Sequence, residues 1–241
     1  MFNAFRRSCV SDAPPARFLP AILILCLSTV LPASIARAQA QDAKPETALG
    51  RQLDRLDLGI SGSDLITRGV SGTSKEFSEP TSLSTSSTLG ALVQIRYIRS
   101  SYVGLEFNYS YARLTENFSF PATTTTGGLT GAFPVQTRMN EYTFGYVAHP
   151  HPIFGVQPFV AVGAGTTAFT PTAGGGEALP ERARMTYYYG VGVEDQLSQH
   201  FGVRVQLRQT FYKAPDFGED YLTIQKQTFT TEPTFGFYLR Y

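Results

Sequence analysis

The chain has 241 residues, of which 42% are hydrophobic and only 16% charged, and its formal net charge is +1. The charged fraction is well below the roughly 25% of a typical soluble domain, and the length suits one domain with a removable leader. The balanced charge excludes the basic electrostatic footprint of a nucleic-acid-binding protein.

The first 40 residues have the three parts of a secretory signal peptide. Three arginines precede an apolar stretch over residues 18–31, and the small residues 33–40 then offer two Ala-x-Ala sites. We expect cleavage after residue 38 or 40. A single membrane anchor is the alternative, but the apolar run is short of the roughly 18 residues that a spanning helix needs, and Pro32 interrupts it.

The mature chain is expected to lack thiols, because both cysteines, Cys9 and Cys26, lie in the leader. This excludes a disulfide framework and a thiolate metal site. Cleavage after residue 40 removes four of 20 basic residues and one of 19 acidic residues, which leaves 16 against 18 and a net charge of −2. No later apolar run has the length of a membrane-spanning helix, so any membrane crossing must use strands.

After a short segment at 41–52, residues 53–241 alternate apolar and polar side chains with the period of two that indicates strands with two different faces. In 89–98, for example, Val93 and Ile95 share one face, and Gln94 and Arg96 share the other. The eight predicted strands are 56–60, 89–98, 103–111, 141–148, 156–169, 187–194, 201–211 and 235–241. This even number predicts an all-β fold, an eight-stranded antiparallel up-and-down transmembrane β-barrel.

The connections between these strands alternate in length. The short ones are 99–101, 149–155 and 196–200. The long ones, rich in Ser, Thr and Gly, are 62–87, 116–136, 171–182 and 213–229. Outer-membrane barrels have short turns on the periplasmic side and long loops outside, so we expect both termini to be periplasmic and the four loops to be mobile and solvated.

Alternation leaves open whether the apolar face points outward or, as in a soluble lipocalin-like barrel, inward. Two features favour an apolar face that points outward. Glycines crowd the polar face, which suits a narrow interior; they are Gly59, Gly90, Gly104, Gly145, Gly190, Gly192, Gly202 and Gly236. Aromatic residues stand near both ends of the apolar face, as interfacial girdles do: Tyr97, Tyr146, Phe201 and Tyr241 toward the turns, and Tyr111, Tyr142, Tyr187 and Phe211 toward the loops.

The C-terminus provides a third feature. Residues 234–241, Thr-Phe-Gly-Phe-Tyr-Leu-Arg-Tyr, resemble the signal that the barrel-assembly machinery recognises, with Gly236 followed by hydrophobic Leu239 and Tyr241 at the third-last and last positions. The chain as a whole resembles the OmpA/OmpX-type outer-membrane β-barrel domain family, without the peptidoglycan-binding domain. It departs from that family in having no Trp and in ending on Tyr rather than Phe.

This resemblance implies a place in the bacterial outer membrane, reached through the barrel-assembly machinery. The expected partners are membrane lipid and lipopolysaccharide, and the expected state is a monomer.

The polar face carries charges that would project into the barrel interior: Arg96, Glu106, Glu141, Glu194, Arg204, Arg208 and Arg240. Isolated buried charges are very costly, so these must pair or remain hydrated. We favour an ion-paired plug over a narrow pore or gate, because eight strands leave room for packed side chains and little else.

No enzyme, metal or cofactor site is expected. The chain's three histidines, His149, His151 and His200, fall in or beside short turns, where we expect them to be turn residues at headgroup level, whereas acyl chemistry at the outer leaflet would need its base at the other end. Lying on two turns without a carboxylate cluster, they also make a poor metal site. Residues 163–168 match the dinucleotide fingerprint in letters only, because no helix can follow them before Pro171.

The sequence therefore favours a structural or surface-interaction role, in which the loops serve adhesion or recognition. A narrow channel for small solutes is the first alternative and a lipid A-modifying barrel enzyme is the second. A soluble lipocalin-like carrier is the last.

Overall fold

The computed structural model describes residues 48–73, 80–100, 102–120, 131–176 and 178–240. The predicted signal peptide, 1–40, and most of the segment 41–52 lie outside these residues. A short helix, α2 (Ala48–Leu53), precedes the first strand. No helix in the described part of the chain is long and apolar enough to cross a membrane.

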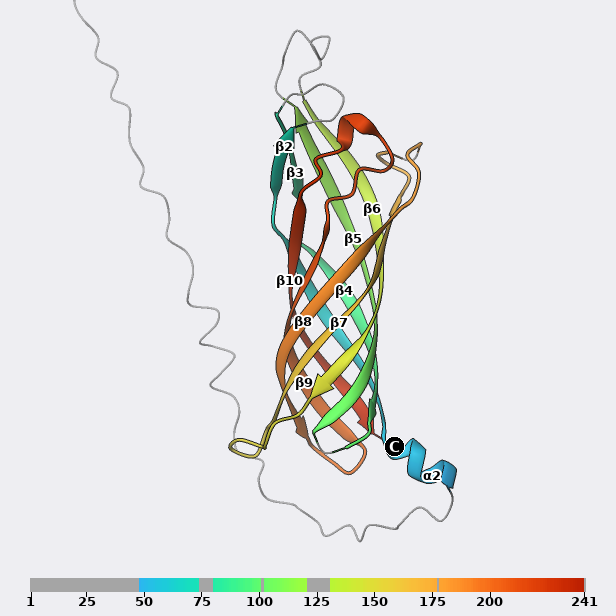
Figure 1. Ribbon diagram of the computed structural model, residues 1–241, viewed down its shortest axis with the longest axis vertical. Helices are drawn as coiled ribbons and strands as arrows, with labels where there is room; N and C mark the ends of the chain where they lie inside the picture. The colour runs from blue at the N-terminus through green and yellow to red at the C-terminus, as the bar shows by residue number, and fades with distance from the viewer. Residues whose placement is uncertain (1–47, 74–79, 101, 121–130, 177, 241) are drawn as a thin grey trace, which may run out of the picture. The chain divides into compact units, whose positions relative to one another are not determined.

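Ten strands form one antiparallel sheet that closes on itself (Figure 1). They are β1 (Leu56–Thr67), β2 (Val70–Thr73), β3 (Pro80–Thr85), β4 (Thr88–Ile98), β5 (Val103–Phe120), β6 (Gly131–Ala148), β7 (Gln157–Pro171), β8 (Arg182–Gln196), β9 (Phe201–Lys213) and β10 (Gln227–Arg240). Eight of them make the ring β5-β4-β1-β10-β9-β8-β7-β6, which the β5–β6 pairing closes. The predicted eight-stranded antiparallel barrel is confirmed.

The two additional strands continue two strands of the ring. Leu65 pairs with Thr88 in β1–β4, and Val70 pairs with Leu83 in β2–β3, so both pairs keep one register. β3 and β4 also follow one another along β5, but with a shift of one residue in register, since Thr85 pairs with Glu116 and Gly90 pairs with Ala112. The prediction of a mobile loop over 62–87 is therefore wrong, because most of its described residues are strand.

Residues 116–136 were also predicted to form a loop, yet the described part belongs to β5 and β6, with Glu116 paired to Val135. The reason lies in composition. Glu116 stands on the inner face beside the apolar Phe118, and Pro134 interrupts the pattern in β6, while the backbone hydrogen bonds that define a sheet do not depend on side-chain polarity. Among the four long connections, those from β7 to β8 (172–181) and from β9 to β10 (214–226) have close to the predicted extents of 171–182 and 213–229.

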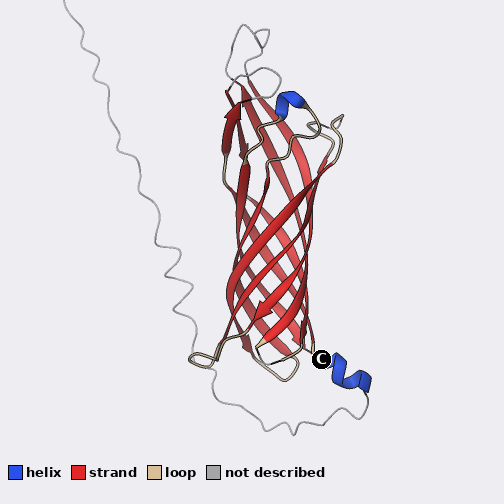
Figure 2. Ribbon diagram, viewed as in Figure 1, coloured by secondary structure: helices blue, strands red, loops and turns tan. Residues whose placement is uncertain are grey.

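The β9–β10 loop, residues 214–226, folds back onto the barrel and contains a 3₁₀ turn, η1 (Asp220–Leu222), at the loop end (Figure 2). Phe217 and Leu222 are completely buried. Ile224 packs against Gly72 of β2 so closely that a Cβ on Gly72 would lie 2.6 Å from Ile224 Cγ2. The prediction of a mobile, solvated segment at 213–229 is wrong, because its apolar side chains cover the upper barrel interior.

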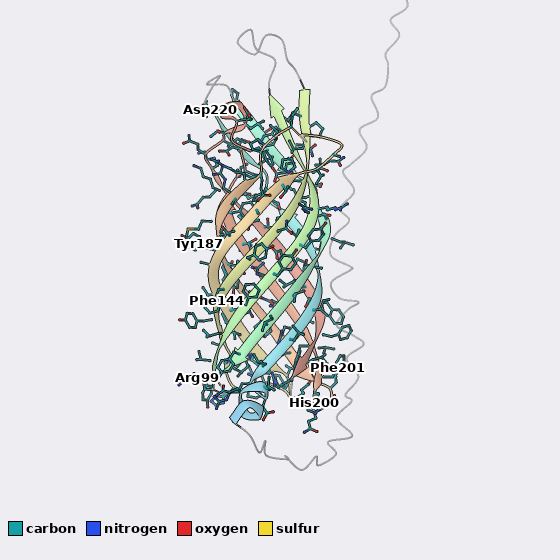
Figure 3. All side chains as sticks on the ribbon, turned by 90° about the vertical axis from the view of Figure 1, so that its right-hand side faces the viewer. Arg99, Phe144, Tyr187, His200, Phe201 and Asp220 are labelled. Carbon is teal, nitrogen blue, oxygen red and sulfur yellow. The ribbon has the colours of Figure 1, made fainter. Side chains whose placement is uncertain are left out.

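The apolar face of the wall points outward (Figure 3). Phe144 and Tyr187 are 54% and 53% exposed, whereas Tyr188, the neighbour of Tyr187, is buried inside. A soluble protein rarely leaves so large an apolar band exposed, so this exterior suits lipid, and the lipocalin-like alternative is wrong. The same figure places Arg99, His200 and Phe201 at the short-turn end and Asp220 at the loop end.

The inner glycines make room for inward rings. A Cβ on Gly202 would lie 2.3 Å from the Tyr238 ring, and one on Gly163 would lie 2.6 Å from the Tyr188 ring. The glycine-rich polar face is therefore an interior in which aromatic side chains lie flat against the opposite backbone.

Candidate functional site

The most distinctive chemistry of the described chain lies inside the barrel, in two groups of charged side chains. The lower ionic cluster, near the short turns, consists of Asp57, Arg96, Glu106, Glu194, Arg204 and Arg240. The upper ionic cluster consists of Glu141, Arg208 and Glu232. Period-two alternation puts these residues on the inner face of strands from all sides of the ring.

Arg204 is the centre of the lower ionic cluster. Its Nη2 donates to Asp57 Oδ2 at 2.8 Å and to Glu194 Oε2 at 2.9 Å. Arg240, half-buried at the mouth, lies 3.4 Å from the same Asp57 oxygen. These contacts join β1, β8, β9 and β10 across the interior.

Arg96 extends the lower ionic cluster toward β5. Its Nε lies 2.5 Å from Glu106 Oε2, and its Nη1 lies 3.3 Å from Glu194 Oε2. The other Glu106 oxygen accepts hydrogen bonds from Asn108 at 2.8 Å and from Tyr188 at 3.1 Å. Three arginines thus face three carboxylates, and the added hydrogen bonds are what a buried ion pair needs to offset its desolvation.

His149 lies inside the floor of the barrel. It was predicted to be a turn residue at headgroup level, but it is nearly buried, and its Nε2 lies 3.5 Å from Glu194 Oε1. The prediction is wrong for His149 because the inward alternation of β6 continues one residue beyond the strand end. His151 and His200 are exposed at the short-turn end, as predicted.

The upper ionic cluster has one arginine between two glutamates. Arg208 contacts Glu141 and lies 3.0 Å from Glu232 Oε2. Thr143 accepts a further hydrogen bond from Arg208 Nη2, and Thr210 donates one to Glu232, whereas the buried Arg208 Nε has no hydrogen-bond partner among the described residues. The single guanidinium therefore ties β9 to β10 on one side and to β6 on the other.

Aromatic rings stack on the guanidinium groups of both ionic clusters. The guanidinium carbon of Arg208 lies 4.4 Å from the Tyr188 ring centre, and that of Arg96 lies 4.2 Å from the Phe159 ring centre. Stacking of this kind stabilises a desolvated cation by about 2 kcal/mol. Polar amides fill the level between the clusters, where Gln94 bonds to Asn108 and Gln206.

Above the two ionic clusters, the upper interior is mostly apolar, although Glu116 is also buried there. Side chains from the wall and from the β9–β10 loop pack there as one cluster: Leu65, Leu83, Ala112, Leu114, Phe118, Val135, Met139, Phe169, Tyr212, Ala214, Phe217, Leu222 and Ile224. Arg96, Glu106, Arg208 and Glu232 below it are completely buried. The described interior is thus filled with side chains at both levels.

All seven predicted interior residues lie on the inner face, but in two clusters rather than one network. Asp57 and Glu232 were missed. Asp57 lies within a predicted strand, two residues before the inward Gly59, so the alternation of the strand could have placed it on the inner face. Glu232 was obscured by Pro233 and by the assumed loop before it. In the predicted assembly signal Gly236 is buried, Leu239 points outward, and Tyr241 lies outside the described residues.

The described residues contain no group of three or more His, Cys, Asp or Glu side chains placed to hold a metal ion. A closed antiparallel barrel with an apolar exterior and a charge-paired interior defines a transmembrane β-barrel protein.

Comparison with known proteins agrees with this class. The model of the outer membrane protein beta-barrel domain family matches residues 24–236, and the chain belongs to that family. Membership implies a place in the bacterial outer membrane. No curated protein matches the sequence.

Several solved structures share the fold. The outer membrane protein OprG from Pseudomonas aeruginosa is 13% identical over 77% of this chain and 95% of its own, with a TM-score of 0.52. Neisserial surface protein A (NspA) is 8% identical over 76% and 97%, with a TM-score of 0.48. Ail of Yersinia pestis, in complex with the heparin analogue sucrose octasulfate, is 12% identical over 78% and 99%, with a TM-score of 0.42. At this identity the likeness to OprG shows the fold alone.

Proposed function

We propose that this chain is a non-enzymatic structural and surface-interaction protein of the outer membrane, exported by a signal peptide that is cleaved after residue 38 or 40. It folds as a monomer through the barrel-assembly machinery and contacts membrane lipid and lipopolysaccharide. Its loop end is the surface available for adhesion or recognition.

One observation carries this proposal: the interior is a plug. Two ionic clusters and an apolar cap occupy the barrel from the short turns to the loops, and their central charges are completely buried. An ion entering this interior would have to replace paired guanidinium and carboxylate groups, which is costly in a low-dielectric interior. The plug therefore supports a structural role over a narrow channel.

The position of the histidines supports the non-enzymatic part. His149, His151 and His200 all lie at or near the short-turn end, and His149 is engaged with Glu194. A serine nucleophile at the outer leaflet would have no histidine base within reach.

Single-channel recording in a planar bilayer tests the plug. We expect purified, folded protein to give no stepwise current, and resolved current steps would instead support the channel alternative. Folding is verified in the same sample by a faster gel band before boiling. The enzymatic alternative is tested by the mass of lipid A from cells that express the chain: we expect it to be unchanged, and loss of an acyl chain would overturn the proposal.

A further inference from the structure

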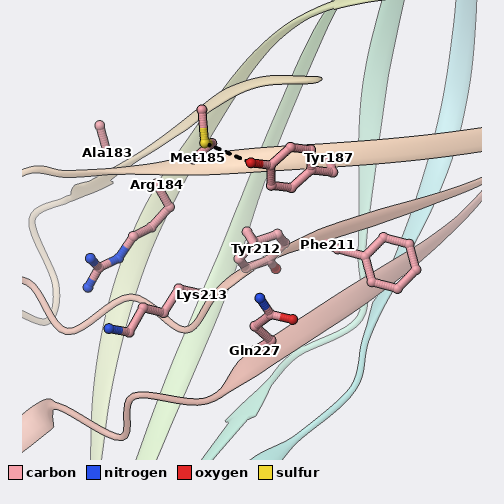
Figure 4. A pocket seen from close by; sticks show the side chains of 8 residues that line it. All are labelled: Ala183, Arg184, Met185, Tyr187, Phe211, Tyr212, Lys213 and Gln227. Carbon is pink, nitrogen blue, oxygen red and sulfur yellow. Dashed lines mark hydrogen bonds between the residues drawn. The ribbon is translucent and has the colours of Figure 1, made fainter. Parts of the chain in front are cut away.

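The seam between β8 and β9 opens toward the loop end. The last pair of the β8–β9 ladder is Thr186 with Tyr212. Beyond it, β8 continues to Arg182 on β7, and β9 continues to Lys213 on β10. The two strands therefore diverge, and a groove of about 560 Å³ lies between them on the outer wall (Figure 4).

The groove has an apolar floor that faces the membrane. Tyr187 and Phe211 form a cross-strand pair, and Met185 lies beside the Tyr187 hydroxyl at 3.0 Å. Met185 is 66% exposed and Tyr187 is 53% exposed. Tyr212, which lines the inner side, is buried in the apolar cluster of the interior. The groove is consequently open to lipid and closed toward the interior.

The rim at the loop end is cationic. Arg184 and Lys213 line the groove, and Figure 4 shows their charged groups on the same side of it. Arg184 and the adjacent Arg182 share one carboxylate, Asp216, at 2.6 Å and 3.3 Å. Lys213 has no carboxylate partner within the described part of the chain. Of the two cations that line the groove, Arg184 is paired with Asp216, and Lys213 remains an uncompensated positive charge directly beside the apolar floor.

We propose that this groove binds a phosphate-bearing acylated lipid of the outer leaflet, an inference that rests on the outer-membrane placement in the proposed function. An acyl chain lies against Met185, Tyr187 and Phe211, and the phosphate lies at Lys213. Charge complementarity selects this occupant: an uncharged lipid would leave the lysine unpaired, and a free phosphate would leave the apolar floor uncovered.

The absence of tryptophan provides a clean test. Tyr187→Trp places the only tryptophan of the chain in the groove, and its emission is excited separately from that of the tyrosines. The protein is reconstituted in phosphatidylcholine vesicles that contain brominated-chain phosphatidic acid or, at equal mole fraction, brominated-chain phosphatidylcholine. We expect phosphatidic acid to quench Trp with about fivefold higher apparent affinity, the factor for one lysine beside an anionic lipid. Inorganic phosphate in excess should not reverse the quenching.

Matched variants locate the effect. Lys213→Gln should abolish the preference for phosphatidic acid, whereas Lys213→Arg, which keeps the positive charge, should retain it. If Lys213→Gln fails to fold, Lys213→Arg still tests whether a positive charge at this position is sufficient. Two variants are the controls. Tyr142→Trp, which replaces an outward tyrosine on β6, should show no preference between the two lipids. Arg138→Gln in the Tyr187→Trp background should leave the preference unchanged. Each variant is used only after its unboiled gel band shows a folded barrel.

Equal quenching by the two brominated lipids, or a preference that survives Lys213→Gln, would overturn the proposal. These outcomes are distinct from failure of the proposed function. Current steps in a planar bilayer would refute the plug while leaving the quenching result unaffected, and a chain that is not embedded in lipid would be quenched by neither lipid.

Discussion

Arg204 Nη2 and Asp57 Oδ2 are 2.8 Å apart, although 147 positions separate the two residues in the sequence. The contact joins β1 to β9, and both side chains are buried. In a barrel whose exterior is lipid, the interior cannot rely on the hydrophobic effect in the usual way. Paired charges and stacked rings take the place of an apolar core at this level.

Asp57→Ala should destabilise the barrel strongly. The substitution removes one of the two carboxylates that Arg204 and Arg240 share and leaves them only Glu194, and breaking a buried ion pair costs about 3 to 5 kcal/mol. Urea unfolding in lipid vesicles measures the change. Asp64→Asn, on the outer face of the same strand, is the control and should shift the unfolding free energy by less than about 0.5 kcal/mol. Equal effects of the two variants would contradict the ionic role of Asp57.

Arg96 and Glu106 should be energetically coupled. Arg96→Met alone leaves Glu106 with only neutral donors, and Glu106→Gln alone leaves Arg96 with its more distant partner, Glu194. In the double variant neither charge is stranded, so its cost should be smaller than the sum of the single costs by about 1 to 3 kcal/mol. A double-mutant cycle of unfolding free energies checks this, and strict additivity would show that the pair does not interact.

Gly202→Ala should be poorly tolerated, because the new Cβ would stand 2.3 Å from the Tyr238 ring. Overpacking of this kind costs about 1 to 3 kcal/mol. Gly62→Ala is the matched control, since a Cβ there meets nothing within 4 Å. The loss of the unboiled gel band at increasing temperature compares the two. If Gly202→Ala were as stable as Gly62→Ala, the close approach of Tyr238 would be refuted.

The β9–β10 loop should loosen in acid. Burial opposes ionisation of the Asp216 carboxyl, but the Gly218 amide and the guanidinium groups of Arg184 and Arg182 outweigh it and hold its pKa below the usual value. A carboxyl whose pKa is lower in the folded than in the unfolded state stabilises the fold. This stabilisation is fully present at a pH above the pKa of the unfolded state, about 3.9, and it is lost as the pH falls through the lower pKa of the folded state. Hydrogen exchange of 214–226 should therefore accelerate below about pH 4.

Asp216→Asn serves as the control for this loop. It should exchange faster than the parent protein at neutral pH and should show no additional acceleration from this carboxyl in acid. If the loop of the parent protein exchanged identically at pH 7 and below pH 4, after correction for intrinsic rates, the stabilising role of the ionised Asp216 would be contradicted.

The period of two along residues 53–241 was sufficient to predict the antiparallel barrel, its eight wall strands and the inward direction of Arg96, Glu106 and Arg204. This works because consecutive side chains of a strand point to opposite faces, and only one face can meet lipid. The rule failed where the alternation of apolar and polar residues is interrupted: Ser and Thr occupy both faces of β3, and Glu116 stands beside Phe118 on the inner face of the upper part of β5. There the backbone pairing continues, and the inward side chains of Leu83 and Phe118 pack in the apolar cluster of the upper interior.

Tertiary structure alone decided which charges meet. Parity places Asp57, Glu194 and Arg204 on the inner face, but the closure and stagger of the ring determine that they lie at one height. The same closure brings His149 to Glu194 and leaves β8 and β9 apart above Thr186. It also sets the width of the upper interior that the β9–β10 loop covers with Phe217 and Leu222. A linear pattern determines the face of each residue, whereas its partners depend on the geometry of the closed ring.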